Sequence, residues 1–343
     1  FMKINFNTNT ILPMFNWLLK VREEDYRDED KLRSILDTAD YQVEFLYYNE
    51  TDLPLPNIPY EEAYDFFMNF DIQESFDNER LEAKREIFNE FVDDIEDKLT
   101  IAEHFADFSK KEETIINGIV QGGLPKSIVE SDKEYEVIFI ISIGNKVGWQ
   151  YGNYLDFDIT QLELTDDKET FLVDIAHEIY NTMFSHLIEN EFTSQQYFLV
   201  NFAYEGLAYH FCNNAFTVNK PSKYAGEMVG VDLEEWEMYV EEHKYLFRKF
   251  KEDFQKCADM SIDDVQSLIE EEYEQFTYWS DAKGMEVYVS MFPSYYLGCY
   301  FWGVIDLAFG KERLFEVLSH PDEIVETYNN AITKLELNTD YLL

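Results

Sequence analysis

The chain has 343 residues, of which 46% are hydrophobic, so it can bury a large core and is not intrinsically disordered. The net charge of −43 excludes nucleic-acid binding, because neutralising phosphates requires clusters of lysine and arginine. No apolar run is long enough to span a bilayer, and the first residues do not resemble a signal peptide. A cytoplasmic protein without membrane association is therefore expected, and its acidic surface favours a basic partner or substrate.

The cysteine content agrees with this location. The three cysteines, Cys212, Cys257 and Cys299, are far apart in the chain and include no Cys-x-x-Cys pair. Neither a disulfide framework nor a cysteine zinc site is indicated by this pattern. We expect all three to be buried thiols in a reducing compartment.

The first third of the chain is predicted to be helical. An apolar stretch at Ile11–Leu19 and a segment at Asp28–Asp37 precede a proline-rich loop at Pro54–Pro59, after which another helix is expected. A charged amphipathic run then extends from about Glu79 to Phe108, with its apolar residues near helical spacing. We expect residues 1–134 to pack as an N-terminal helical layer.

The character of the sequence changes after residue 134. Tyr135–Ser142 is β-branched and apolar, and a loop with three glycines follows over Gly144–Gly152. Apolar and acidic residues then alternate over Tyr154–Ile159, which is typical of a half-buried strand. Two strands therefore precede the next predicted helix, and helical patterns dominate from about Lys168 to the C-terminus.

The helix predicted over Lys168–Asn190 contains the segment His177-Glu178-Ile179-Tyr180-Asn181. Its apolar stripe faces the core. At about 100° per residue, His177 and Asn181 lie on roughly the opposite face, about 40° apart, with Glu178 on the flank. Because that face also carries apolar residues, we expect both sides of this helix to be covered.

A second helix is expected to run back along the first. It starts at the capping box Thr193-Ser194-Gln195-Gln196 and contains Glu205-Gly206-Leu207-Ala208. The short link makes the two helices antiparallel neighbours. With a rise of about 1.5 Å per residue, Glu205 lies about 19 Å from the turn, between Asn181 at about 16 Å and His177 at about 22 Å. This spacing lets the Glu205 carboxylate face His177 and Asn181.

These three side chains are candidate zinc ligands. A catalytic zinc takes three protein ligands and leaves one position for a water molecule, whose pKa falls towards about 7. His177, Asn181 and Glu205 would be the ligands, and Glu178 would be the general base as the zinc-bound water attacks a peptide carbonyl. Asn181 offers only a neutral amide oxygen, which is a poorer zinc donor than imidazole and should weaken binding by orders of magnitude.

The chain resembles the gluzincin-type zinc peptidases, in which the helix motif is H-E-x-x-H and a later E-G-L-A segment supplies the third ligand. Asn181 stands at the position of the second histidine. The resemblance covers about the last two-thirds of the chain. Its segments, in order, are the apolar strand and glycine loop with Trp149, Leu155-Asp156-Phe157-Asp158, Ile175-Ala176-His177-Glu178, Asn201–Ala208, and Pro293–Gly298 followed by Gly310, Pro321 and Tyr328.

The resemblance implies a zincin-like α+β fold, mostly helical, with a small sheet before the helix that carries His177. Residues 135–343 would form the zincin-like core with the C-terminal helices, in one compact unit with residues 1–134. The resemblance further implies that Tyr295 or Tyr296 stabilises the oxyanion as a catalytic residue. An edge strand beside the Gly144–Gly152 loop would pair with an extended peptide.

Several interpretations of these residues are open. In one, the protein is a zinc-dependent peptidase acting on a peptide or protein substrate. In another it is a catalytically degenerate relative that has lost zinc and binds peptides, which Asn181 and the acidic surface favour. In the plainest interpretation, His177 is a core histidine bonded to a neighbour and Glu205 is an ion-paired helix residue. Whether the protein is an active enzyme depends chiefly on Asn181.

Overall fold

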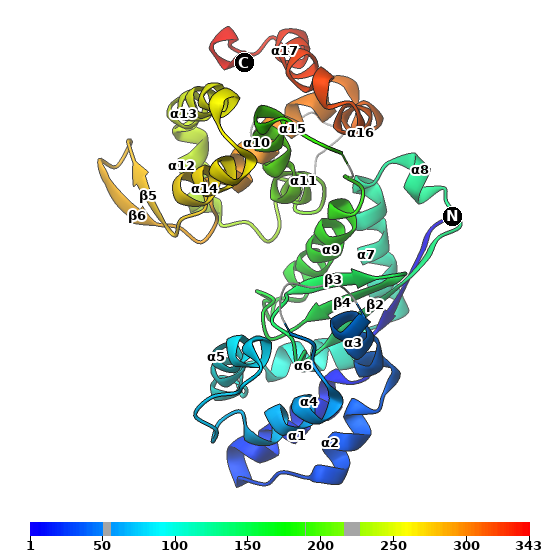
Figure 1. Ribbon diagram of the computed structural model, residues 1–343. Helices are drawn as coiled ribbons and strands as arrows, with labels where there is room; N and C mark the ends of the chain where they lie inside the picture. The colour runs from blue at the N-terminus through cyan, green and yellow to red at the C-terminus, as the bar shows by residue number, and fades with distance from the viewer. Residues whose placement is uncertain (51–55, 189, 216–226) are drawn as a thin grey trace. The chain divides into compact units, whose positions relative to one another are not determined.

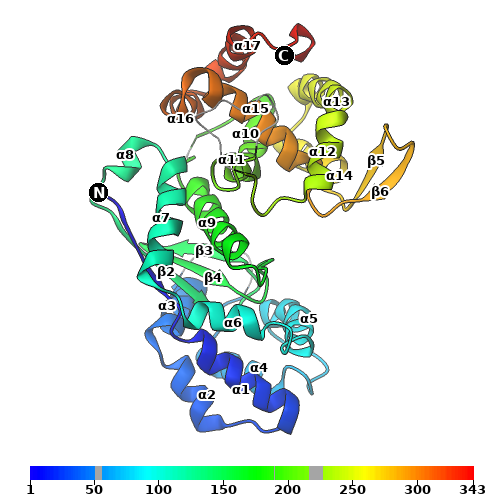
Figure 2. The same cartoon turned by 180° about the vertical axis from the view of Figure 1, so that it is seen from behind.

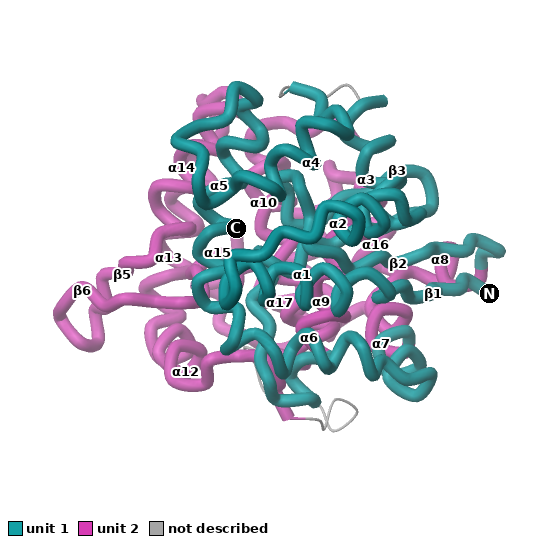
Figure 3. Tube along the Cα trace, turned by 90° about the horizontal axis from the view of Figure 1, so that it is seen from below, with its two compact units in different colours: residues 1–117, 131–172 teal, residues 118–130, 173–343 magenta. Residues whose placement is uncertain are grey.

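The computed structural model describes residues 1–50, 56–188, 190–215 and 227–343 (Figure 1). It is a mostly helical α+β protein, with 62% helix and a small mixed four-stranded sheet, as the sequence predicts. The zincin topology stays a prediction, and so does the division of the sequence at residue 134. The chain forms two compact units (Figure 3). Unit 1 consists of residues 1–117 and 131–172, and unit 2 of residues 118–130 and 173–343.

Unit 1 contains the sheet and the first helices. In chain order its elements are β1 (Lys3–Asn7), α1 (Ile11–Glu24), α2 (Glu29–Leu36), α3 (Ala39–Glu50), α4 (Tyr60–Asn69), α5 (Glu79–Asp93), α6 (Leu99–Ala106), α7 (Lys110–Gly123), β2 (Glu134–Ile140), β3 (Gly148–Tyr151) and β4 (Tyr154–Asp158). The last turns of α7 belong to unit 2.

Unit 2 is built mainly from helices. Its elements are α8 (Lys126–Val129), α9 (Lys168–Ser185), α10 (Ser194–Asn201), α11 (Ala203–Phe211), α12 (Leu233–Glu241), α13 (His243–Lys256), α14 (Ile262–Tyr273), β5 (Thr277–Ser280), β6 (Met285–Tyr288), α15 (Pro293–Phe309), α16 (Lys311–Ser319) and α17 (Ile324–Lys334). Short 3-10 turns occur at Cys257–Asp259, Pro321–Glu323 and Thr339–Tyr341. The first turn of α9 belongs to unit 1.

The first helices of unit 1 follow the sequence pattern closely. Asp28 caps α2, because its side chain accepts a hydrogen bond from the backbone amide of Lys31. The amphipathic run predicted from about residue 79 to 108 is divided into α5 and α6. Asp93 and Asp94 have low helix propensity, and they add negative charge at a helix C-terminus, where the helix dipole disfavours it. Continuation of α5 is therefore unfavourable at this point.

The sheet of unit 1 has the strand order β1-β2-β4-β3. β1 pairs in parallel with β2, with Lys3 opposite Glu134, and β2 pairs in parallel with β4. The prediction of a wholly helical first third is wrong here, although Ile4 and Phe6 alternate with polar residues as in a strand. A strand from the start of the chain thus completes a sheet whose other strands lie more than a hundred residues later.

The glycine loop between β2 and β4 contains a strand of its own. β3 is the edge strand, and it forms an antiparallel hairpin with β4. The turn between them includes Gly152, whose φ of +58° is readily adopted only by glycine. Trp149 of β3 stacks on Tyr47, with ring centroids 4.2 Å apart. β2 and β4 are therefore parallel neighbours, and the antiparallel hairpin is formed by β4 with β3, which lies inside the loop.

A group of buried charged side chains lies at the ends of β2 and β4. Lys84 of α5 forms an ion pair with Asp158, and their side chains are 0% and 1% exposed. Glu44 of α3 accepts a hydrogen bond from Ser142, and burial raises the pKa of Glu44 to about 7. Asp156 is also fully buried, and burial followed by the charge of Glu44 raises its pKa. We call Glu44, Lys84, Asp156 and Asp158 the unit 1 cluster.

In unit 2, α11 and α15 approach each other backbone to backbone. The capping box predicted at Thr193–Gln196 is confirmed as the start of α10, but the helix is interrupted at Phe202 before α11 continues. A Cβ atom at Gly298 of α15 would lie 1.9 Å from the Phe202 carbonyl oxygen. A Cβ atom at Gly206 of α11 would lie 2.3 Å from the Gly298 carbonyl carbon. The approach therefore requires glycine at both positions.

A two-stranded antiparallel hairpin, β5–β6, precedes α15 and was not expected from the helical pattern of this region. It projects from the helices of unit 2 next to α12 and α14 (Figures 1 and 2). α15 ends at Gly310, which has a φ of +88° and is confirmed as a helix stop. Pro321 begins the 3-10 turn that leads into α17, close to the helix start predicted there.

Candidate functional site

His177 lies in the middle of α9, which is covered on both sides as expected. Ile175 and Ile179 are fully buried on one side, and Phe184 is fully buried as well. His177 itself is only 7% exposed. A polar ring at such a position needs hydrogen-bond partners inside the protein.

Glu205 of α11 provides the first partner of His177. Its Oε2 lies 2.9 Å from His177 Nε2, and its Oε1 accepts a hydrogen bond of 2.9 Å from Asn181 Nδ2. Asn181 Nδ2 also lies 3.2 Å from His177 Nε2. Ligands of a tetrahedral zinc with bonds near 2.0 Å are separated by roughly 3.3 Å. His177 Nε2 and Glu205 Oε2 therefore lie at about the spacing of two ligands of one metal ion, and Asn181 lies beside them but turns its amide nitrogen, which cannot bind a metal, towards both.

Asn213 is the second partner of His177, and sequence reasoning missed it. Its Oδ1 lies 2.6 Å from His177 Nδ1, and its Nδ2 donates a hydrogen bond of 3.0 Å to the carbonyl oxygen of Val229. The bond to Val229 fixes which end of the Asn213 amide faces the ring. His177 Nδ1 therefore carries a hydrogen and donates it to Asn213, which leaves Nε2 as the nitrogen that faces Glu205.

The contact between His177 and Glu205 shifts their pKa values in opposite directions, upwards for His177 and downwards for Glu205. Burial acts to lower the pKa of His177, but the hydrogen bond and charge of Glu205, helped by the charge of Glu178, raise it to about 9. Burial acts to raise the pKa of Glu205, but the bonds from His177 and Asn181 lower it. At neutral pH the pair is thus an imidazolium and a carboxylate. The Glu205 side chain is 39% exposed, so the pair opens to solvent on that side.

The third predicted ligand, Asn181, decides how well a metal ion fits. Among the residues that the structure describes, no three His, Cys, Asp or Glu side chains are grouped so as to hold a metal ion. Asn181 Oδ1 is buried and has no hydrogen-bond partner, and a cation would satisfy such an oxygen. The imidazole nitrogen and the carboxylate therefore fit zinc, and the amide oxygen joins them as a weak third donor when the Asn181 amide turns its oxygen towards them.

Tyr209 is a further residue of the cluster that sequence reasoning missed. Its ring lies edge-on to His177, with centroids 4.9 Å apart, and stacks on Tyr295 at 5.3 Å. Burial, followed by the charge of Glu205, raises the pKa of Tyr209, so its hydroxyl stays protonated. The spacing could have revealed it, because Tyr209 follows Glu205 by four residues on α11 and therefore lies on the same helix face.

The other predicted site residues lie at different places. Glu178 is half-buried on α9, and its charge contributes to the raised pKa of both His177 and Tyr209. Tyr295 lies beside the cluster through its contact with Tyr209. Tyr296 is fully buried, and its hydroxyl lies 3.0 Å from His243 Nδ1. The structure therefore brings Glu178 and Tyr295 towards His177 and engages the Tyr296 hydroxyl elsewhere.

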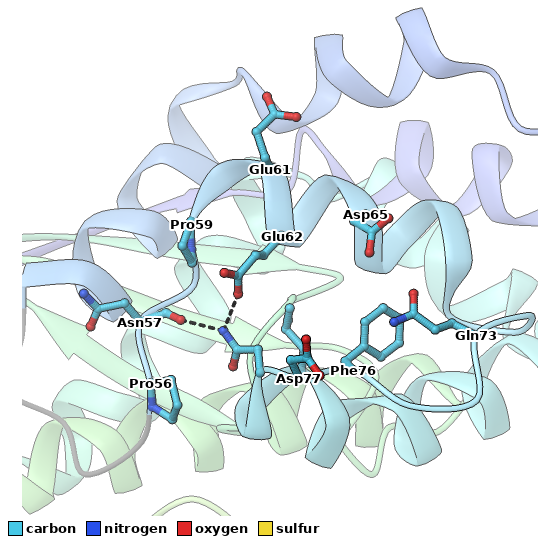
Figure 4. Close-up of a pocket in the computed structure, with 11 residues that line it drawn as sticks. Pro56, Asn57, Pro59, Glu61, Glu62, Asp65, Gln73, Phe76 and Asp77 are labelled. Atoms are coloured by element: carbon cyan, nitrogen blue, oxygen red, sulfur yellow. Dashed lines mark hydrogen bonds between the residues drawn. The ribbon is translucent and has the colours of Figure 1, made fainter.

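A separate cavity of about 700 Å³ lies in unit 1, beside α4 and the start of α5 (Figure 4). Asn78 bridges two parts of its wall by donating hydrogen bonds of 2.7 Å to Glu62 and to the carbonyl oxygen of Asn57. Among the described residues that line it, none is a histidine or a cysteine. Its acidic lining residues are Glu61, Glu62, Asp65 and Asp77. The cavity therefore lacks the ligand chemistry that the His177 cluster has.

The chain is a mostly helical α+β protein that brings together the His177 imidazole and the Glu205 carboxylate, with Glu178 next to His177 in the sequence. These are the residue types of a zinc hydrolase. Residues 59–336 match the family described as "Putative zinc dependent peptidase (DUF5700)", and the chain belongs to that family. The family name implies zinc dependence and a peptide substrate. No curated protein and no solved structure matches the chain. Within its described parts, no helix has the length and hydropathy to cross a membrane.

Proposed function

We propose that this protein is a zinc-dependent peptidase whose metal ligands are His177, Asn181 and Glu205. The observation that carries the proposal is the convergence of these three side chains within 3.2 Å of one another. It occurs in a chain that belongs to a family named for zinc-dependent peptidases. Peptides are accordingly the substrate class, and the net charge of −43 favours basic ones.

The surroundings of His177 support its role as a ligand. The hydrogen bond from Nδ1 to Asn213 leaves Nε2 towards Glu205, and outer bonds of this kind orient metal-binding histidines. A metal ion must displace the Nε2 proton, and a pKa of about 9 makes that proton a competitor at neutral pH. Zinc binding is therefore expected to strengthen as the pH rises towards 9.

The neighbouring side chains have distinct tasks in peptide hydrolysis. Zinc, when bound, supplies a Lewis acid that lowers the pKa of water and polarises a carbonyl group. The Glu178 carboxylate accepts a proton from the attacking water and delivers it to the leaving amine. The protonated hydroxyl of Tyr209 donates a hydrogen bond to the developing oxyanion, and Tyr295 stacks against its ring. Tyr209 replaces Tyr296 in this role because His243 engages the Tyr296 hydroxyl.

A degenerate peptidase that binds peptides without cutting them is the second candidate. One observation favours it: the His177–Glu205 ion pair and the Asn181 bond to Glu205 close the cluster by hydrogen bonds alone. In that case the site is stable without zinc, and Asn181 acts as a hydrogen-bond donor in place of a ligand.

The variant Asn181→His separates the two candidates. Wild type and variant are dialysed against buffered zinc, their metal content is measured, and both are incubated with a peptide library. Zinc binding and cleavage by the wild type, with cleavage lost in Glu178→Gln, would support the peptidase. Zinc binding that is seen only in Asn181→His would identify the natural protein as degenerate.

A further inference from the structure

The hairpin β5–β6 of unit 2 exposes an unusual number of large apolar side chains. Phe276 is 54% exposed, Trp279 and Met285 are each 55% exposed, and Tyr288 is 73% exposed. Exposed aromatic groups that gather on one surface mark binding sites more often than isolated ones do. Their position in a chain with 70 acidic residues makes the group more distinctive.

The strand register places two of these side chains on the same face. Thr277 is paired with Tyr288, and Trp279 with Glu286, so all four side chains project from one side of the hairpin. The opposite side is attached to the protein at Tyr278 and Ser280, which both donate hydrogen bonds to Glu242. One face of the hairpin is therefore anchored, and the face with Trp279 and Tyr288 is directed to solvent.

A continuous row of aromatic rings connects this face with the candidate zinc centre. Successive ring centroids are 6.0, 5.0, 5.3, 5.3 and 4.9 Å apart. Exposure falls along the row, from 73% at Tyr288 to 7% at His177, with half-buried rings between Phe276 and His177. The rings of this row, which we call the aromatic row, are in order Tyr288, Phe276, Phe292, Tyr295, Tyr209 and His177.

Acidic side chains accompany the aromatic row. Glu286 lies on the exposed face of the hairpin together with Trp279 and Tyr288. Glu274 lies shortly before the hairpin. Burial, then the charge of Glu270, and then the charge of Glu205 raise the pKa of Glu274, so Glu274 is close enough to Glu205 to feel its charge. A ligand on this surface therefore meets aromatic rings and negative charge together.

We propose that the aromatic row is the substrate-binding surface and that it selects extended peptides in which a large apolar or aromatic residue lies next to lysine or arginine. The inference rests on the proposed function of the His177 cluster. Continuity with that cluster identifies the occupant as the peptide to be cut, and the glutamates select its positive charge. Rings provide large contact area at low conformational cost, which suits them to hold side chains of many sequences.

The test measures binding without hydrolysis. Fluorescein-labelled peptides with a central Phe-Lys pair in a glycine-serine background are titrated with zinc-free protein in EDTA, and fluorescence anisotropy gives Kd. The double variant Phe276→Ser/Tyr288→Ser removes the two most exposed rings of the aromatic row, and circular dichroism checks its fold. Tyr26→Ser is the matched control, because Tyr26 is 51% exposed and belongs to unit 1, whereas the aromatic row belongs to unit 2. Peptides with Ser-Lys or Phe-Glu at the centre test the two parts of the selectivity.

The expected result is a Kd for the Phe-Lys peptide that rises about tenfold in the double variant and is unchanged in Tyr26→Ser. The wild type should also bind the Ser-Lys and Phe-Glu peptides more weakly. Equal Kd values for wild type and double variant, or no preference for Phe-Lys, would overturn the inference. A protein that binds the Phe-Lys peptide selectively but cuts no peptide would support the aromatic row as a peptide-binding surface and refute the proposed peptidase activity. Failure of the binding proposal and failure of the proposed function are therefore distinguishable.

Discussion

Buried charged side chains occur in both units, but the two groups differ in their access to solvent. In the unit 1 cluster, Lys84 and Asp158 are sealed from solvent, with Glu44 and Asp156 also inside. In unit 2, His177 is buried, but the side chain of Glu205 is 39% exposed and the aromatic row leads to it. Both groups contain shifted pKa values, so such shifts alone do not identify a functional site. Exposure to solvent distinguishes the second group from the first.

The largest expected effect is on catalysis in unit 2. Glu178→Gln keeps the size of the side chain but removes the proton acceptor, so peptide hydrolysis should fall by about 10²–10⁴-fold. Cleavage is followed by mass spectrometry of the products, and circular dichroism should show an unchanged fold. Hydrolysis at the wild-type rate would remove Glu178 from the mechanism.

The unit 1 cluster should respond in stability rather than activity. Lys84→Met leaves the Asp158 charge buried without its partner, which should cost about 3–5 kcal/mol in the free energy of unfolding. Urea denaturation measures this loss. Lys3→Met is the matched control, because the Lys3 side chain is 66% exposed in its ion pair with Glu134 and solvent screens that pair, so its removal should change stability far less. A similar small loss in both variants would mean that the Lys84 ion pair has no special structural role.

Replacing Asn181, the weak member of the proposed ligand set in unit 2, with a stronger ligand should increase the affinity of that unit for zinc. Asn181→His supplies an imidazole in place of the amide, so the zinc Kd should fall by at least about tenfold. Competition with a chromogenic chelator measures Kd. The change should depend on Glu205, so Asn181→His/Glu205→Gln should lose most of the gain. An unchanged Kd in Asn181→His would mean that position 181 does not face the metal ion.

The most gradual effects are expected in the pH dependence of stability. Glu44 and His177 both have raised pKa values, so the folded state holds each proton more tightly than the unfolded chain does. Stability should fall as pH rises from 4.5 to about 7 through Glu44, and from 6.5 to about 9 through His177. Urea denaturation across this range in EDTA should show that Glu44→Gln flattens the first fall and Glu205→Gln the second. A wild-type curve without either fall would contradict the assignment.

Parts of this account could be predicted from sequence because they depend on local geometry. The helical rise and the short link after α9 predicted that Glu205 can face His177 and Asn181, and the structure places the three within hydrogen-bond distance. Their role as ligands stays a proposal. The capping box at Thr193–Gln196 and the helix stop at Gly310 were predicted for the same local reasons.

Other features depend on contacts between distant parts of the chain. β1 becomes a strand by pairing with β2, and nothing in the first residues specifies that distant partner. Asn213 lies beyond the end of α11, so a pattern of helical neighbours alone does not place it against His177. The hairpin β5–β6 is short, and its exposed rings break the alternation by which half-buried strands are recognised.

The most direct test of the central claim is the zinc content of the purified protein, measured by mass spectrometry after loading and dialysis. Wild type and Glu205→Gln are compared at a pH close to 9, where the His177 proton competes least. The account predicts about one zinc ion per chain in the wild type and a loss of most of it in Glu205→Gln. No zinc in the wild type, or equal zinc in both proteins, would contradict the assignment of the metal centre to His177, Asn181 and Glu205.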